Sequence, residues 1–106
     1  MDNAGFAVEL TPEAEIDYLN QVIWLEQNRS SDLAYQFITD FRRLSKMISI
    51  NPYQWQTVMI QDRRVHRAVV STKYVVLYQV LSAEKVVNIL RIRGAAEDWT
   101  NTPIAE

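Results

Sequence analysis

The hydrophobic pattern of this chain changes its period at Asn51-Pro52, and this change limits the folds that the chain can adopt. Over most of the chain before this dipeptide, apolar residues recur three and four positions apart, which is the spacing of an amphipathic helix. After Asp62, runs rich in β-branched and aromatic residues have the period of strands. Proline disfavours the helical conformation of the residue before it, so the helical part must end there. The sequence therefore predicts helices followed by strands, in an α+β fold.

Two consecutive helices are predicted in the first half. A strand is predicted over Phe6–Leu10. The next residues, Thr11-Pro12-Glu13, have the features of an N-cap, a first-turn proline and a first-turn acid, so the first helix begins there. This helix ends near Asn28. A turn of three or four residues then leads to the second helix, and the pair should form an antiparallel hairpin. The expected apolar positions are Ile16, Leu19, Val22, Ile23 and Leu25 in the first helix, and Ala34, Phe37, Ile38, Phe41, Leu44 and Ile48 in the second.

Three strands are predicted over Val65–Val70, Tyr74–Leu81 and Val86–Arg93, with Pro52–Asp62 as a loop before them. The middle strand is apolar on both faces, which is typical of a central strand. We therefore expect residues 1–106 to form a single domain with the order β-α-α-β-β-β, in which a helix hairpin packs on one face of a small antiparallel sheet.

The charge is distributed unevenly. The formal net charge of -2 argues against a dedicated nucleic-acid binder, yet residues 63–93 hold seven basic residues and one acidic residue, a net charge of +6. Strand alternation places Val86, Asn88, Leu90 and Ile92 on one face of the last strand, the face that the helices should cover. Arg67, Arg91 and Arg93 then share the open face, either as a working surface or at frayed strand ends that contact only water. The expected binding surface consists of Arg63, Arg64, Arg67, Arg91, Arg93 and Trp99.

The residues that carry most catalytic chemistry are scarce. His66 is the single histidine, and alternation turns it to the helix-facing side, which favours a packed residue over a catalytic one. The chain has no cysteine, and the acidic residues at the start of the first helix are explained by the helix dipole, so no metal site is expected. Two glycines cannot build a phosphate-binding loop, so no cofactor is expected. Without a signal pattern or an apolar span of membrane length, we expect a cytoplasmic protein.

In this order the elements resemble the RelE/ParE toxin superfamily, whose members are the toxins of type II toxin–antitoxin systems and are also called plasmid stabilisation proteins. The resemblance implies a compact α+β toxin that a cognate antitoxin wraps with an extended or helical segment. It is carried by the strand before Thr11-Pro12-Glu13-Ala14-Glu15, by Asn51-Pro52, by Arg67–Val70, by Tyr74–Val80, and by Val87–Ile92 followed by Asp98-Trp99.

The chain also differs from the RNA-cleaving members of this superfamily. Those members carry a basic residue just after the last strand, where this chain has Gly94 and Glu97, and commonly an arginine where this chain has Val75. The chain is therefore more similar to ParE-like members, which are associated with DNA gyrase. This implies a growth-inhibiting toxin that binds an essential target, gyrase, and performs no chemistry itself.

Two alternatives remain open at this point. The first is a RelE-like endoribonuclease that acts on mRNA at the ribosome, in which Arg67, Arg91 and Arg93 stabilise phosphate charge. The second is a relative that keeps antitoxin binding without toxicity. Trp99 fits either a plug at the edge of the core or an anchor for a partner.

Overall fold

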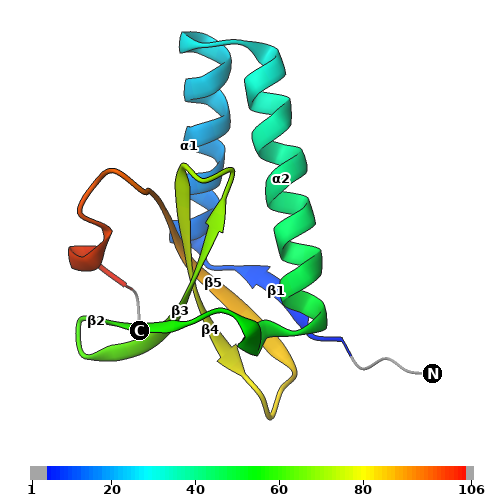
Figure 1. The fold of residues 1–106 in the computed structure, drawn as a ribbon, viewed down its shortest axis with the longest axis vertical. Helices are drawn as coiled ribbons and strands as arrows, with labels where there is room; N and C mark the ends of the chain where they lie inside the picture. Colours follow the sequence, from blue (N-terminus) through cyan, green and yellow to red (C-terminus); the bar gives the residue numbers. More distant parts are fainter. Residues whose placement is uncertain (1–4, 105–106) are drawn as a thin grey trace.

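The computed structural model describes residues 5–104 and places a helix hairpin against one face of a five-stranded sheet (Figure 1). The strands lie in the order β1-β5-β4-β3-β2, so β4 is central as predicted, and the predicted α+β class is confirmed. The elements in chain order are β1 (Ala7–Leu10), α1 (Pro12–Asn28), α2 (Ser31–Ile50), the short helix η1 (Pro52–Gln54), β2 (Thr57–Ile60), β3 (Arg63–Val70), β4 (Tyr74–Leu81), β5 (Val86–Gly94) and the short helix η2 (Trp99–Asn101).

The first helix begins at the predicted N-cap, Thr11, and the second begins after Ser30, inside the predicted turn. The Thr11 side chain accepts a hydrogen bond from the backbone N–H of Ala14 at 3.2 Å, and Ser30 accepts one from Leu33 at 3.1 Å. These bonds satisfy N–H groups that have no partner inside the helix. Only residues 29 and 30 separate the two helices, a shorter turn than predicted. The predicted end of the second helix before Asn51-Pro52 is confirmed.

The sheet differs from the prediction in two details. The prediction of a loop over Pro52–Asp62 is wrong, because this segment contains η1 and the edge strand β2. β2 joins β3 through a two-residue turn at Gln61 and Asp62, whose φ angles are 50° and 63°. β1 pairs with β5 in parallel, so the sheet is mixed rather than antiparallel. The chain between these two parallel neighbours is a long connection that runs through the helix hairpin and then through β2, β3 and β4.

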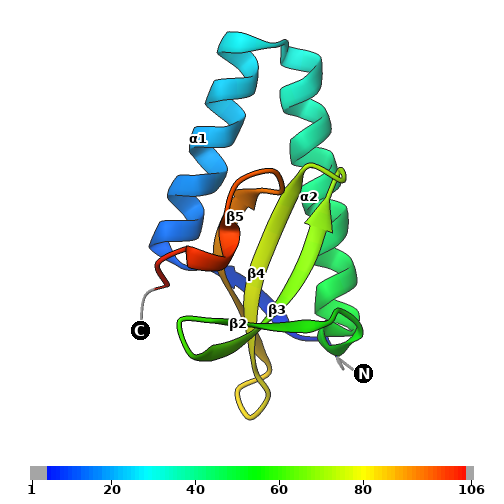
Figure 2. The same ribbon diagram turned by 60° about the vertical axis from the view of Figure 1, so that its left-hand side comes forward.

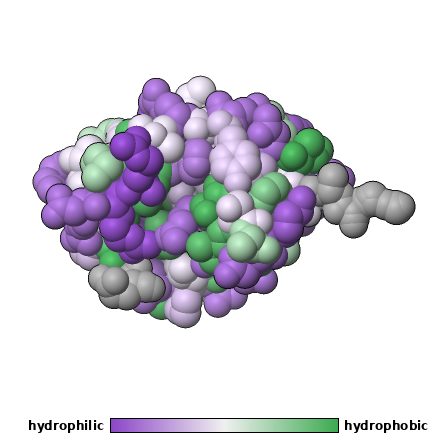
Figure 3. All heavy atoms as spheres, turned by 90° about the horizontal axis from the view of Figure 1, so that it is seen from below, coloured by the Kyte–Doolittle hydropathy of each residue, from purple (hydrophilic) through white to green (hydrophobic). Residues whose placement is uncertain are grey.

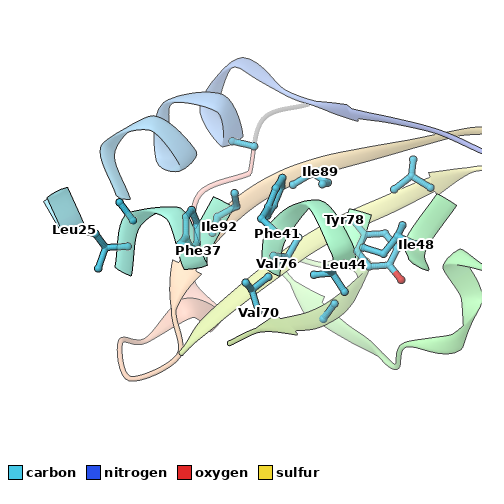
Figure 4. Packing of buried hydrophobic residues seen from close by; sticks show 14 residues of the cluster. Leu25, Phe37, Phe41, Leu44, Ile48, Val70, Val76, Tyr78, Ile89 and Ile92 are labelled. Carbon is cyan, nitrogen blue, oxygen red and sulfur yellow. The ribbon is translucent and has the colours of Figure 1, made fainter. Parts of the chain in front are cut away.

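The main core lies between α2 and the sheet. Figure 4 shows the apolar side chains of α2 directed at those of β3, β4 and β5. The stripe predicted for this helix is confirmed at five of its six positions, since only Ile38 is not fully buried. The core consists of Ala14, Leu25, Ala34, Phe37, Phe41, Leu44, Ile48, Ala68, Val70, Val76, Tyr78, Val87, Ile89 and Ile92.

The stripe predicted for α1 is confirmed at Leu25, which is buried in the core, and at Val22, which packs against the core, but it is wrong at its other three positions. Ile16, Leu19 and Ile23 remain 58%, 52% and 49% exposed. The helix instead contacts α2 through Tyr18, whose ring lies between two phenylalanine rings of α2 at 5.0 and 5.6 Å. Successive helical residues are about 100° apart, so directing Tyr18 inward turns Leu19 away from the hairpin contact. α1 consequently presents three large aliphatic side chains to solvent.

A β-bulge changes which side chains of β5 face the helices. Leu77 of β4 pairs with Arg91 and Tyr78 pairs with Ile89, so Leu90 is the extra residue on β5. The pleat shifts at this point. Leu90 therefore packs on the face away from the helices, and Ile89 packs in the main core, the reverse of the prediction.

The face away from the helices is not open as predicted. A second buried cluster occupies it, consisting of Ile60, Val65, Val75, Leu77, Leu90 and Ile104. β2 and the chain around η2 lie against this side of the sheet (Figure 2). The predicted concave basic surface is thus largely replaced by a small second core, with the arginines around it.

Candidate functional site

Arg91 lies on the face predicted for it, but its guanidinium is already bound. Its Nε and Nη2 donate to the Asp17 carboxylate at 2.7 and 3.1 Å, and its Nη1 donates to the Pro103 carbonyl at 2.9 Å. Asp17 also accepts the backbone N–H of Ile92 at 3.0 Å. The hydrogen bond that Arg91 donates to Asp17 raises the pKa of Arg91 further above its ordinary value. Arg91 therefore ties α1 to β5 and to the C-terminal segment.

Arg93 lies beside a second carboxylate. Its Nε is 3.4 Å from Glu97 Oε1, and the same oxygen accepts the backbone N–H of Gly94 at 2.7 Å. A hollow of about 280 Å³ adjoins this contact. It lies between α1 and the end of β5 and is lined by Asp17, Asn20, Gln21, Trp24, Tyr74, Ile92, Arg93, Gly94 and Glu97.

Arg67 shares the face of Arg91, because both residues pair with Leu77 from opposite sides. Two strand spacings, roughly 10 Å, therefore separate their backbones. The Arg67 guanidinium lies over the ring of Trp99, 5.6 Å from its centroid. The same guanidinium also donates to the side-chain oxygen of the Gln56 carboxamide.

The remaining predicted basic residues lie at the β2–β3 hairpin. Arg63 donates to the Gln79 carboxamide at 2.5 Å, and Arg64 donates to the Thr57 hydroxyl at 3.2 Å. Arg64 is exposed, and its backbone pairs with Met59 of the edge strand β2. The six predicted surface residues thus form three groups: Arg91 with Arg93, Arg67 with Trp99, and Arg63 with Arg64.

His66 lies on the helix-facing side, as predicted, and is packed. Its ring is parallel to that of Tyr78, with centroids 5.0 Å apart, and its Nδ1 lies 2.8 Å from the Trp55 carbonyl oxygen. The buried Tyr78 hydroxyl donates to the Pro52 carbonyl at 2.5 Å, and burial raises the pKa of this phenol. Both groups are on the opposite face from Arg67, Arg91 and Arg93, so neither is placed to exchange a proton at those arginines.

A different surface, which the sequence reasoning missed, is apolar. Ile16, Leu19, Ile23 and Trp24 of α1 are each about half exposed, between 49% and 58%. A hollow of about 370 Å³ lies between α1 and α2 next to Leu19. The signal was present in the sequence. Apolar residues from 16 to 25 surround more than one side of the helix, so they cannot all face one core.

Comparison with known proteins identifies the fold and the family. Residues 8–99 match the family described as the ParE toxin of the type II toxin–antitoxin system parDE. The chain belongs to this family. A search of curated proteins gave no match.

Two solved structures share the fold of this ParE-family chain. It is similar to a chain of the chromosomal ParDE toxin–antitoxin system from P. aeruginosa, with a TM-score of 0.68 and 16% identity, over 84% of this chain and 95% of that chain. It is also similar to a chain of the RelBE2 toxin–antitoxin complex from Mycobacterium tuberculosis, with a TM-score of 0.62 and 17% identity, over 92% of this chain and 100% of that chain. The predicted membership of the RelE/ParE superfamily is confirmed.

The described part of this ParE-family chain has neither a metal-binding cluster nor a membrane-spanning helix. Within residues 5–104, no group of three or more histidine, aspartate or glutamate side chains is arranged to hold a metal ion. No helix in that part of the chain is long and apolar enough to cross a membrane.

Proposed function

We propose that this chain is a cytoplasmic toxin that stops growth by binding DNA gyrase and that a cognate antitoxin neutralises it. Membership of the ParE toxin family supports the toxin role. One observation carries the preference for binding over chemistry: two of the three arginines that would stabilise phosphate charge lie against carboxylates of the chain itself. Arg91 is bound by Asp17, and Arg93 lies beside Glu97.

The exposed side of α1 supports the antitoxin part of the proposal. Interfaces between proteins are most apolar at their centre and favour aromatic anchors. Leu19 and Ile23 are one helical turn apart, and Trp24 adjoins them. An amphipathic antitoxin helix with its apolar side on this surface would bury these side chains. Figure 3 shows the opposite end of the molecule, away from the α1–α2 turn. On this end hydrophilic residues predominate, and apolar residues lie between them.

The basic residues at the other face are proposed as a second contact. Arg63 and Arg67 share this face of β3, and Trp99 packs beside Arg67, whereas Arg64 alternates to the helix-facing side of the strand. Acidic side chains of a partner would pair with these groups and guide its approach. Arg91 and Arg93 would contribute less, because both lie beside a carboxylate of this chain.

The test compares the two targets directly. The purified chain, freed of its antitoxin, is added to gyrase with relaxed plasmid and, separately, to translating ribosomes with a defined mRNA. We expect loss of supercoiling and intact mRNA, and the same chain preincubated with its antitoxin is the control. Cleaved mRNA with normal supercoiling would instead identify an endoribonuclease. Normal growth on induction without antitoxin would identify a non-toxic relative.

A further inference from the structure

Glu97 occupies a site that has the form of a carboxylate receptor. One of its oxygens accepts the Gly94 backbone N–H at 2.7 Å and lies 3.4 Å from Arg93 Nε. A backbone N–H beside a guanidinium is a common way for proteins to hold an oxyanion. We call this pair of donors the Arg93–Gly94 notch.

The fit of Glu97 in the notch is incomplete. Charge-assisted hydrogen bonds of this kind are typically about 2.7–2.9 Å long, whereas the Arg93 contact measures 3.4 Å. Among the described residues, buried Arg93 Nε is the side-chain atom that finds no hydrogen-bond partner. The Glu97 side chain is 47% exposed, and residues 95–98 all lie at the surface. Such an exposed pair is weak, so Glu97 can leave the notch without disturbing the core.

We propose that Glu97 is a surrogate ligand of the Arg93–Gly94 notch and that an acidic side chain of the antitoxin displaces it. Only the identity of the partner rests on the proposed function. The adjoining hollow of about 280 Å³ has room for the rest of the incoming residue, and half-exposed Trp24 gives it an apolar wall. Displacement then replaces the weak contact between Glu97 and Arg93 by a contact between the partner's carboxylate and Arg93. Arg93 therefore keeps a carboxylate beside it when the partner binds.

The charge around the notch favours a carboxylate over a phosphate. Asp17 and Glu97 both line the hollow, so a ligand that enters it meets two carboxylates close to the one arginine. Like charges repel, and the repulsion grows with the charge of the ligand. A single carboxylate is therefore accepted more readily than a phosphate with its higher charge.

The Gly94 backbone amide is a direct reporter for this proposal. The chain has only two glycines, so the amide resonance of Gly94 is readily assigned in a two-dimensional NMR spectrum. The probe is N-acetylglutamate α-amide, which carries one carboxylate, and inorganic phosphate is the comparison. Glu97→Ala empties the notch. Asp98→Ala is the matched control, because it removes a neighbouring carboxylate that accepts from the side chains of Thr100 and Asn101 and from the Thr100 backbone, outside the notch.

We expect the probe to shift the Gly94 resonance in Glu97→Ala at concentrations roughly 5- to 50-fold lower than in the unaltered chain, since one hydrogen bond and one weak ion pair no longer compete. Asp98→Ala should behave like the unaltered chain. Equal titrations of Glu97→Ala and the unaltered chain, with both folded, would overturn the proposal. So would an equal gain in Asp98→Ala, or a stronger response to phosphate. None of these results alters the gyrase test, so the two proposals fail separately.

Discussion

Replacing Asp17 by asparagine should destabilise the fold, because Asp17 is the partner of three donors. Two come from Arg91 and one is the backbone N–H of Ile92. Asparagine keeps the shape of the side chain but removes the charge and turns one acceptor into a donor facing a donor. Breaking a buried ion pair costs about 3–5 kcal/mol. The Arg91 and Asp17 side chains are still 15% and 12% exposed, so we expect about 2–4 kcal/mol, or roughly 10–20 °C in Tm.

Urea unfolding followed by circular dichroism measures this loss as a change in midpoint at constant slope. Glu15→Gln is the matched control, since it removes the same charge from an exposed position two residues earlier in α1. Its effect should stay within the roughly 0.3–1 kcal/mol of a helix-dipole interaction. A loss below about 1 kcal/mol for Asp17→Asn would refute the role given to the pair. A confirmed loss means that reduced toxicity of an Arg91 variant cannot be assigned to catalysis without a stability measurement.

Three further predictions follow from other contacts. Tyr78→Phe removes the hydrogen bond to the Pro52 carbonyl inside the core and should lower the free energy of unfolding by about 1–2 kcal/mol. The hydrogen bond from Ser71 lowers the pKa of Asp40 below its ordinary 3.8, so Ser71→Ala should reduce stability by about 1 kcal/mol at neutral pH. The difference in stability between Ser71→Ala and the unaltered chain should narrow as pH falls through the folded pKa of Asp40. The Ser71 hydrogen bond favours the ionised carboxylate, and this form is lost on protonation. Leu19→Glu should weaken antitoxin binding about tenfold or more, measured by calorimetry, while stability changes by less than about 0.5 kcal/mol.

Each of these variants has a control on the same chain. Tyr35→Phe alters a phenol that is 70% exposed and should leave stability unchanged. Thr72→Ala alters the hydroxyl next to Ser71, which donates only to a local backbone carbonyl, so it should leave the acid dependence of stability unchanged. Gln54→Glu adds the same charge as Leu19→Glu at an exposed polar position of η1, away from α1, and equal loss of antitoxin binding there would point to charge rather than apolar contact.

The helices and the three long strands could be predicted because their signals are local. Thr11 and Ser30 cap their own helices, and Pro52 limits the second helix. The strand β2 could not be found in this way, since it has only four residues. Its turn at Gln61 and Asp62 needs two positive φ angles, a conformation that asparagine and glycine usually signal, and neither residue is present there.

The faces of β5 could not be predicted because strict alternation fails at the bulge. One extra residue, Leu90, reverses the direction of the side chains before it relative to those after it. The bulge follows from pairing with β4, which a single strand does not encode. The orientation of α1 was missed for a related reason. Tyr18 competes with its aliphatic neighbours for the contact with α2, and an aromatic ring between Phe37 and Phe41 wins because it buries more surface.

The local net charge of +6 over residues 63–93 overstates how many of these arginines are available to a phosphate. A count along the sequence treats each arginine as available to a phosphate. In the fold, the carboxylate that binds Arg91 comes from α1, 74 residues away, and Arg93 lies beside the carboxylate of the segment after β5. Releasing Arg91 for a phosphate would leave Asp17 buried and unpaired, which opposes the release. Arg93 faces no such penalty, so it is the arginine of the pair whose partner can change when another protein binds.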